Sequence, residues 1–296
     1  MQCNAMQCNA MHCNALHCNA WLPGRTDVAT LIGMDMTGLR TALVVALLLL
    51  PTLATGATRA APAALLICFE DVPQRPWTMP DGTGLNFEMM KRVETLLGER
   101  FSYTGRPWKR CLEELRLGRV DALMGAADGP ERRTYALFPT HQDGAIDTSQ
   151  AMYSERYNVF LRKGSSAAWD GRRLRTRENA VLVQAGYLVA SYARERGLQA
   201  VERAKSSEDA LRMVAEGMFD AAILYGDESL LIAREDARFR ERVVHAPGPF
   251  WVSDFYLMTS THAYQRDPAR IKAIWQAVAT VRQSAEYQKL VGRAVQ

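Results

Sequence analysis

Short apolar runs alternate with segments of helical apolar spacing along most of the chain. In the first half, apolar runs predict strands at 63–69, 101–103 and 120–124, and apolar residues recurring every three to four positions predict helices at 85–97 and 108–117. The stretch 73–84 between the first strand and the first helix is predicted to be a loop. Strands that alternate with helices in this way indicate an α/β fold with a mostly parallel sheet.

The second half repeats this plan. Strands are predicted at 180–183 and 219–224, and helices at 187–196, from Ser206 or Ser207 to 218, at 268–281 and at 285–294. The segments 115–122 and 214–221 also match. Each segment contains the end of a predicted helix, followed by a glycine (Gly118 or Gly217) at the position where a left-handed residue often terminates a helix. Each then has Asp-Ala at the start of a predicted strand. Two such turns can match by chance, but the shared order of elements around them favours two similar lobes.

The first sixty residues have a different pattern. Residues 1–20 are a five-residue polar repeat that cannot bury a core. We interpret residues 1–33 as an upstream segment outside the native protein. The alternative is a metal-binding tract, since His12, His17 and four cysteines carry ligand chemistry, but their even spacing contains no Cys-x-x-Cys pair.

Residues 34–60 predict a secretory signal peptide. A short basic start precedes the apolar run 41–50, and small residues follow at 51–57, which places cleavage after Ala57 or Ala60. The alternative is an uncleaved anchor, although the apolar run is short for a membrane span. The mature protein is therefore expected in the periplasm, with two of the six cysteines, Cys68 and Cys111.

Composition excludes some functions. The formal net charge is +4, and basic residues are scattered among acidic ones, so no nucleic-acid interface is expected. No metal-ligand spacing, activated nucleophile pair or cofactor motif occurs after residue 60, and the histidines there are few: His141, His245 and His262.

Several motifs occur in an order that resembles a known family. They are 107–115 (PWKRCLEEL), 118–122 (GRVDA), 131–133 (ERR) leading to Phe138-Pro139, 157–164 (YNVFLRKG) and 217–221 (GMFDA). Together, behind a predicted signal peptide, they resemble the family 3 bacterial extracellular solute-binding proteins. The resemblance covers residues 62–296. It implies an α/β, two-lobed periplasmic binding protein type II fold, with a ligand cleft between lobes joined by two hinge strands.

The resemblance also implies boundaries and a function. Lobe one would comprise 61–155 and 252–296, and lobe two 156–251, with closure by a hinge motion. The protein would be a monomeric receptor that captures an amino acid or related carboxylate and delivers it to an inner-membrane ABC permease, without a cofactor. Two alternatives are a periplasmic enzyme of the dehydratase type, with Asp128 or Glu70 as its acid or base, and a ligand-sensing module.

Lobe one carries most of the predicted ligand-binding residues. Arg132 matches the family's carboxylate clamp, because a guanidinium offers two parallel hydrogen bonds to a carboxylate; the alternative is a surface arginine. Trp108 and Trp77 match aromatic walls, or else pack in the core. Arg110 is one further polar group, and Glu70, together with Asp71, could hold an amine or be a plain loop carboxylate.

Lobe two contributes a turn and a strand end. Gln184, Gly186 and Tyr187 lie between a strand and a helix, where unpaired backbone N–H groups attract anions. Tyr225 stands where the family often has the aspartate that pairs with an α-ammonium, with Asp227 two residues later. Because an unpaired buried ammonium is costly, this departure makes an ordinary α-amino acid a less certain ligand.

Three further features leave alternatives open. The segment 125–130 lacks the Ser or Thr that many amino-acid binders carry before the arginine. The stretch 140–149 is long, and either covers the cleft or forms a surface hairpin. Cys68 and Cys111 are both expected at the cleft end of lobe one, where they form a disulfide or remain two buried thiols.

Overall fold

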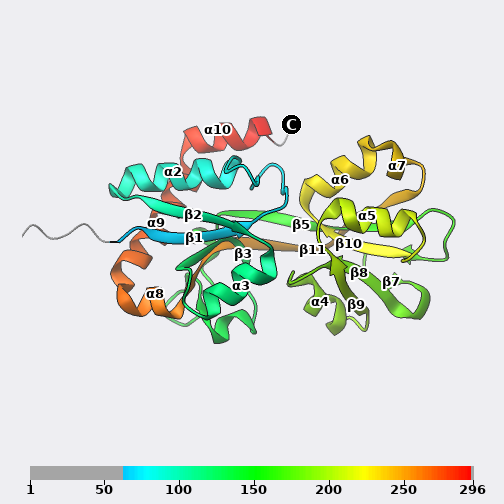
Figure 1. Cartoon of the computed structure of the whole chain (residues 1–296), viewed down its shortest axis with the longest axis horizontal. Coiled ribbons are helices and arrows are strands. Elements are labelled where there is room, and N and C mark those ends of the chain that lie inside the picture. Colours follow the sequence, from blue (N-terminus) through cyan, green and yellow to red (C-terminus); the bar gives the residue numbers. More distant parts are fainter. Residues whose placement is uncertain (1–62, 295–296) are drawn as a thin grey trace, which may run out of the picture. The chain divides into compact units, whose positions relative to one another are not determined.

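The computed structural model describes residues 63–294, so the predicted upstream segment and signal peptide lie outside the described residues. Within the described range, no helix combines the length and the apolar character that crossing a membrane requires. The elements fall into two groups joined by two long strands (Figure 1). We call these groups lobe one and lobe two.

Lobe one contains the chain's first four strands and five of its helices. These are β1 (Leu65–Glu70), α2 (Leu85–Leu97), β2 (Phe101–Arg106), α3 (Trp108–Arg116), β3 (Ala122–Ala127), β4 (Ala136–Leu137), α8 (Thr261–Arg266), α9 (Pro268–Gln283) and α10 (Ala285–Ala294). β1 lies between β2 and β3 and is parallel to both. α3 packs on β1 and β3, while α2, α9 and α10 pack against one another.

Lobe two has a similar sheet with fewer strands. Its elements are β8 (Ala180–Gln184), α4 (Val189–Glu195), β9 (Gln199–Ala204), α5 (Ser207–Ala215), β10 (Ala221–Tyr225), α6 (Gly226–Glu235), α7 (Ala237–Arg240) and the hairpin of β6 (Ala168–Trp169) and β7 (Leu174–Arg175). β8 runs parallel to both β9 and β10. α5, α6 and α7 cover one face of this sheet and α4 the other (Figure 1).

Two strands belong to both lobes. β5 (Tyr153–Arg162) pairs along its length with β11 (Val243–Ser260), and both are antiparallel to their outer neighbours. β11 pairs with β3 of lobe one, and β5 pairs with β10 of lobe two, which gives the strand order β2-β1-β3-β11-β5-β10-β8-β9. These strands are the two connections that the resemblance implies.

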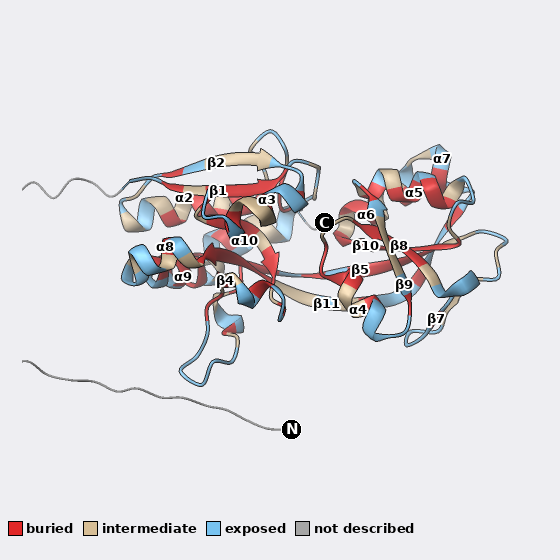
Figure 2. Cartoon of the chain, turned by 60° about the horizontal axis from the view of Figure 1, so that its bottom comes forward, coloured by how far each residue is buried: buried red, intermediate tan, exposed pale blue. Residues whose placement is uncertain are grey.

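Hydrophobic burial follows the strands. The residues of β10 are all buried, and those of β1 nearly all, while the helices expose their outer faces (Figure 2). One core cluster fills lobe one and extends to Val181 and Tyr187 of lobe two, and a second lies under α5 around Phe160 and Leu211. The core of lobe one is thus continuous with the part of lobe two that faces it.

The two matching turns have the predicted conformation. Gly118 and Gly217 have φ angles of 67° and 79°, and the strands that follow begin at Ala122 and Ala221. The preceding aspartates anchor these strands. Asp121 Oδ2 accepts a hydrogen bond from the Leu66 backbone N–H (2.8 Å), and Asp220 Oδ1 accepts one from Arg162 Nη2 (2.6 Å).

Other local predictions need correction. β3 begins at Ala122 instead of residue 120, α4 begins at Val189 instead of 187, and α6, α7 and α8 were not predicted. Of the two alternatives for 140–149, the surface hairpin is correct. A bridge between Thr140 and Ile146 closes a turn whose residues 140–145 are exposed.

We predict that the two turn glycines differ in their tolerance of alanine. A left-handed backbone costs a non-glycine residue about 1 kcal/mol, so Gly217→Ala should destabilise the protein by roughly that amount. A Cβ at Gly118 would also lie 2.8 Å from the His262 ring, whereas one at Gly217 meets nothing closer than 3.8 Å. Urea unfolding should show a larger loss for Gly118→Ala, and equal losses would contradict the prediction.

Candidate functional site

The carboxyl ends of four strands face one another between the lobes. β1 ends at Glu70 and β3 at Ala127 in lobe one, and β8 ends at Gln184 and β10 at Tyr225 in lobe two. Open α/β sheets bind their ligands at this edge. The candidate site is therefore built from the turns that follow these strands.

A small cavity lies at the centre of this region. Aromatic side chains make up most of its wall, namely Trp108, Tyr157, Tyr187, Tyr225 and Phe255. The remaining wall is formed by Gln74, Gly125, Ala127 and Arg132. Its volume is about 10 Å³, which is room for about one water molecule. The lobes or the aromatic rings must therefore move before a larger ligand can enter.

Arg132 is the charged residue of this cavity, and the structure buries it. Arg132 is the first residue of the short helix 132–134, and it is 5% exposed. Nη1 donates to the Ala127 carbonyl (2.8 Å), Nη2 donates to the Gly186 carbonyl of lobe two (3.2 Å), and the guanidinium lies 5.6 Å from the Trp108 ring centre. Burial lowers the pKa of Arg132. Within residues 63–294, no carboxylate forms an ion pair with it.

Glu70 and Tyr187 connect the lobes beside this cavity. Glu70 is 4% exposed; its Oε1 accepts a hydrogen bond from the Trp108 backbone N–H (3.1 Å), and the Tyr187 hydroxyl lies 3.4 Å from Oε2. Gln74 Nε2 donates to the same hydroxyl (2.5 Å). Burial, and to a lesser degree the charge of Asp71, raises the pKa of Glu70 from 4.5 to about 8. At neutral pH this carboxyl is mainly protonated.

The predicted aromatic walls have different positions. Trp108 lines the cavity, whereas Trp77 does not. Trp77 stacks on Tyr153 with 4.1 Å between ring centres, and its Nε1 donates to Glu155 Oε2 (2.9 Å). Trp77 therefore follows the core-packing alternative and supports the strands beneath the site.

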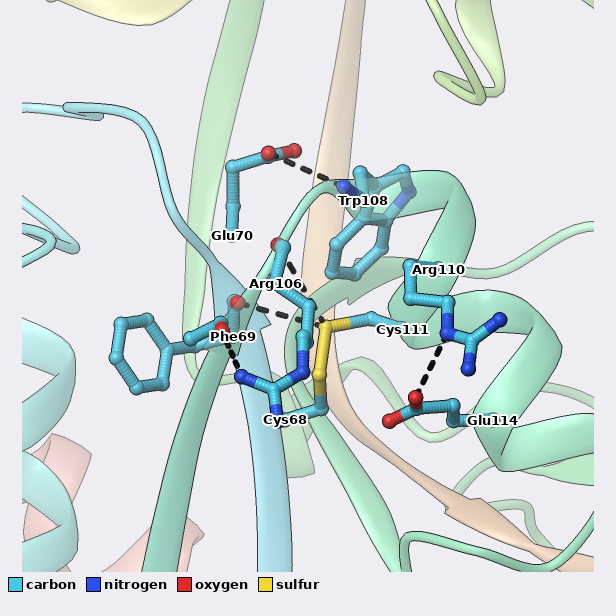
Figure 3. The surroundings of a disulfide bond; sticks show 9 residues. Cys68, Phe69, Glu70, Arg106, Trp108, Arg110, Cys111 and Glu114 are labelled. Atoms are coloured by element: carbon cyan, nitrogen blue, oxygen red, sulfur yellow. Dashed lines mark hydrogen bonds and ion pairs between the residues drawn. A yellow bond between two sulfur atoms is a disulfide. The ribbon is translucent and has the colours of Figure 1, made fainter.

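Arg110 is not brought to the cavity. Its side chain lies on the exposed side of α3, where Nε donates to Glu114 Oε1 (2.8 Å), as Figure 3 shows. The two residues are one helical turn apart, so this pair follows from local spacing. The expectation that Arg110 reaches into the cleft was wrong.

The turn after β8 also differs from expectation. The N–H groups of Ala185, Gly186 and Tyr187 already donate to Ala204 O (3.0 Å), Glu202 Oε2 (2.9 Å) and Gln184 O (3.3 Å). The prediction that this turn offers unpaired N–H groups to an anion was therefore wrong. The turn instead contributes the Gly186 carbonyl, which accepts from Arg132, and the Tyr187 side chain. Gln184 is buried and does not line the cavity.

A larger opening lies outside the small cavity, between α3 and α4. It measures about 410 Å³, and half of its lining residues are charged, including Lys109, Glu131 and Glu202. Arg132 and Tyr187 line both spaces and so separate them. Lys109 of lobe one and Glu202 of lobe two approach to 3.4 Å across this opening.

A disulfide joins two segments of lobe one that form the site. Cys68 on β1 and Cys111 on α3 are both fully buried, with a Cα–Cα distance of 5.7 Å (Figure 3). Cys68 lies two residues before Glu70, and Cys111 lies three residues after Trp108. The bond therefore fixes the end of β1 to the start of α3, beside the Glu70–Trp108 hydrogen bond.

Comparisons with known proteins identify the architecture. The sequence matches no protein-family model and no curated protein. A solved histidine kinase sensor domain with similarity to periplasmic binding proteins aligns at 19% identity over 78% of this chain and 96% of its own, with a TM-score of 0.62. This chain has the two-lobed fold of the periplasmic binding proteins.

Two further structures with this fold also align. The putative binding component of an ABC transporter from Wolinella succinogenes DSM 1740, complexed with lysine, covers 79% of this chain and 96% of its own at 14% identity, with a TM-score of 0.61. The ancestral amino acid-binding protein AncCDT-1, a precursor of cyclohexadienyl dehydratase, covers 79% and 95% at 18% identity, with a TM-score of 0.58. At these identities the likeness concerns the periplasmic-binding-protein fold alone.

Five residues of the cavity wall were not among the predicted site residues: Gln74, Gly125, Ala127, Tyr157 and Phe255. Tyr157 and Phe255 lie on β5 and β11, which were expected to serve as hinges only. Tyr157 is directly opposite Trp251 on β11 and Tyr225 on β10, so one row of aromatic residues crosses the sheet beneath the site. No local signal in the sequence reveals which aromatic ring of such a row faces a cavity.

We predict that the disulfide stabilises the protein by about 2–4 kcal/mol, as expected for two cysteines 43 residues apart. Urea unfolding of Cys68→Ala/Cys111→Ala should show this loss. A reductant should lower the stability of the parent and leave the double variant unchanged. Peptide mass spectrometry of unreduced protein should find Cys68 and Cys111 unalkylated, and free thiols at both positions would contradict the bond.

We predict a pH-dependent stability penalty from Glu70. Its folded pKa of about 8 exceeds its ordinary value of 4.5, so the unfolded chain ionises first and stability declines as the pH rises between these values. Glu70→Gln cannot ionise and retains an acceptor for the Trp108 N–H. Denaturant unfolding at pH 5 and pH 8 should therefore show a variant whose advantage over the parent grows with pH. Parallel profiles would contradict the assignment.

Proposed function

We propose that this protein is a periplasmic receptor that captures a small carboxylate between its lobes and delivers it to an inner-membrane ABC permease. One observation carries the proposal, which is the buried Arg132 guanidinium without an anionic partner in the described residues. A buried charge is costly unless it is paired. A ligand carboxylate would pair with Arg132 through two parallel hydrogen bonds.

Contacts across the cleft support capture by closure. Arg132 of lobe one contacts Gly186 of lobe two, and Tyr187 of lobe two contacts Glu70 and Gln74 of lobe one. These contacts depend on the closed arrangement, so they break when the lobes separate about β5 and β11. A ligand that binds groups of both lobes at once favours the closed state. The solved structures of the same fold include a binding component of an ABC transporter, which supports this role.

The roles of individual residues follow from the geometry. Arg132 would hold the carboxylate, and Trp108 would cover it, because the guanidinium already lies over this ring. Tyr157, Tyr187 and Tyr225 would enclose the rest of the ligand. Gln74, which lines the cavity, would bind a neutral polar group of the ligand after Tyr187 has moved. The proposed receptor is a monomer, and the oligomeric state of the purified protein can be measured by light scattering.

We predict that Arg132→Ala abolishes ligand binding. A thermal-shift screen against amino acids, keto acids and other small carboxylates should find a ligand, since binding at a hundred times the dissociation constant adds about 2.7 kcal/mol of stability. Arg132→Lys should bind weakly, because an ammonium lacks the planar fork. A carboxylate that stabilises Arg132→Ala as strongly as the parent would contradict the proposal.

Arg133 provides the matched control for this test. It is adjacent in sequence and has the same side chain, but it is exposed and pairs with Asp128 (2.6 Å). Arg133→Ala removes the same charge from the protein and should leave the response to the ligand intact. The melting temperature without ligand, measured for each variant, separates a loss of binding from a loss of folding.

Glu70 favours a second candidate, an enzyme of the dehydratase type on the same scaffold. A buried carboxyl with a pKa of about 8 is suited to act as a general acid near neutral pH. The other residue considered for this role, Asp128, is held in an ion pair with Arg133. The bound ligand can be followed by NMR for several hours. Its conversion would favour the enzyme, and its recovery unchanged would favour the receptor.

A further inference from the structure

The charge distribution of the inner cavity indicates a class of ligand, and this inference rests on the proposed function. We propose that the site prefers carboxylates whose other polar groups are neutral over α-amino acids of the same shape. Such ligands include simple, keto and hydroxy acids. This preference follows from the groups that face the cavity and from the engagement of the nearby carboxyls elsewhere.

The inner cavity offers one charge. Among the described residues that line it, Arg132 is charged, and the others are aromatic, small or, in Gln74, an amide. A ligand carboxylate is neutralised by Arg132, but a ligand ammonium meets no anion in this wall. Removing an ammonium from water without an anionic partner is unfavourable, and the faces of aromatic rings compensate in part only.

The two buried carboxyls nearest the site are engaged elsewhere. Glu155 accepts hydrogen bonds from Trp77 Nε1 (2.9 Å) and from the Arg156 backbone N–H (2.8 Å). Glu70 accepts from the Trp108 N–H and faces Tyr187, and neither carboxyl lines the cavity. Burial raises the pKa of both, and that of Glu70 reaches about 8, so Glu70 is largely neutral at pH 7.

The strand end in lobe two also presents a neutral group. Tyr225, the last residue of β10, is 3% exposed, and its hydroxyl donates to the Tyr153 hydroxyl (2.9 Å). Its ring packs edge-on against Tyr157, Tyr187 and Phe255. This position therefore encloses an apolar or aromatic part of the ligand and provides no counter-charge.

Neutral polar groups of a ligand would find hydrogen-bond partners in the cavity wall. Tyr157 and Gln74 line the cavity, and their side chains carry a hydroxyl and an amide. A hydroxyl can donate or accept, and an amide oxygen accepts. These groups suit a keto or hydroxyl oxygen beside the carboxylate. After the site has opened, the aromatic side chains of this wall would contact an aliphatic or aryl body.

The test uses carboxylates that differ only in the group at the α-carbon, which is hydrogen, a keto oxygen or an ammonium. Isothermal titration calorimetry at pH 7 compares 3-phenylpropionate and phenylpyruvate with L-phenylalanine, and 4-methylpentanoate and its 2-keto derivative with L-leucine. We expect the acid without an ammonium to bind at least tenfold more tightly in each series that binds. An amino acid that binds as tightly as its partner, or more tightly, overturns the inference.

Failure of the inference and failure of the proposed function give different results. Tight binding of an α-amino acid that Arg132→Ala abolishes would overturn the inference and support the receptor. No binding by any member of the panel, or by any carboxylate of the thermal-shift screen, would overturn both. Binding unaffected by Arg132→Ala would overturn the proposed function, whatever the preference within a pair.

A substitution at Tyr225 tests the physical cause. Tyr225→Asp introduces the missing counter-charge and should shift the ratio of affinities toward the amino acid by at least tenfold. Tyr225→Asn introduces a side chain that is similar in size to aspartate but uncharged. It therefore separates the effect of the charge from the effect of removing the ring. Equal ratios for the two variants would contradict an electrostatic origin of the preference, and circular dichroism verifies that both are folded.

Discussion

The buried guanidinium of Arg132 is the constraint on which the rest of the site depends. A charge in this position requires partners, and within the described chain it finds two carbonyls, Ala127 O in lobe one and Gly186 O in lobe two, together with the face of Trp108. Carbonyl dipoles stabilise a cation less than a carboxylate does. The closed protein therefore holds a strong donor group with partners that a ligand anion can replace.

Both sides of this interaction are fixed within their own lobes. In lobe one, the Cys68–Cys111 disulfide and the Glu70–Trp108 hydrogen bond hold the start of α3 against the end of β1. In lobe two, Glu202 holds the Gly186 N–H, and the left-handed backbone of Gly186 (φ 82°) directs the turn. Each half is thus prepared before closure, and the variable is the separation of the halves, as in hinge closure generally.

The sequence predicted the local features of the fold better than those of the site. Apolar periodicity located most of the described helices and the five strands β1, β2, β3, β8 and β10, and Gly118 and Gly217 adopt the expected backbone, because these features depend on neighbours in sequence. Trp77, Arg110 and the turn amides were assigned wrongly because their partners, Glu155, Glu114 and Glu202, compete with any ligand. The Glu155 and Glu202 contacts arise from tertiary packing, and which face of α3 turns outward also depends on the fold.

The same competition gives Tyr187 a central role in the proposed receptor. In the structure its hydroxyl forms hydrogen bonds with Gln74 and Glu70, and Tyr187 lines a cavity that has little free volume. A ligand must therefore replace Tyr187 and Gly186 as the groups that join the lobes. The affinity for the ligand then reflects the difference in free energy between two closed arrangements, one joined by Tyr187 and Gly186 and the other joined by the ligand. A neutral solute that replaces the Gly186 carbonyl gains little interaction energy with Arg132, because one neutral acceptor takes the place of another. A carboxylate instead brings a full negative charge to Arg132. The anionic group is therefore the part of the ligand that drives the exchange.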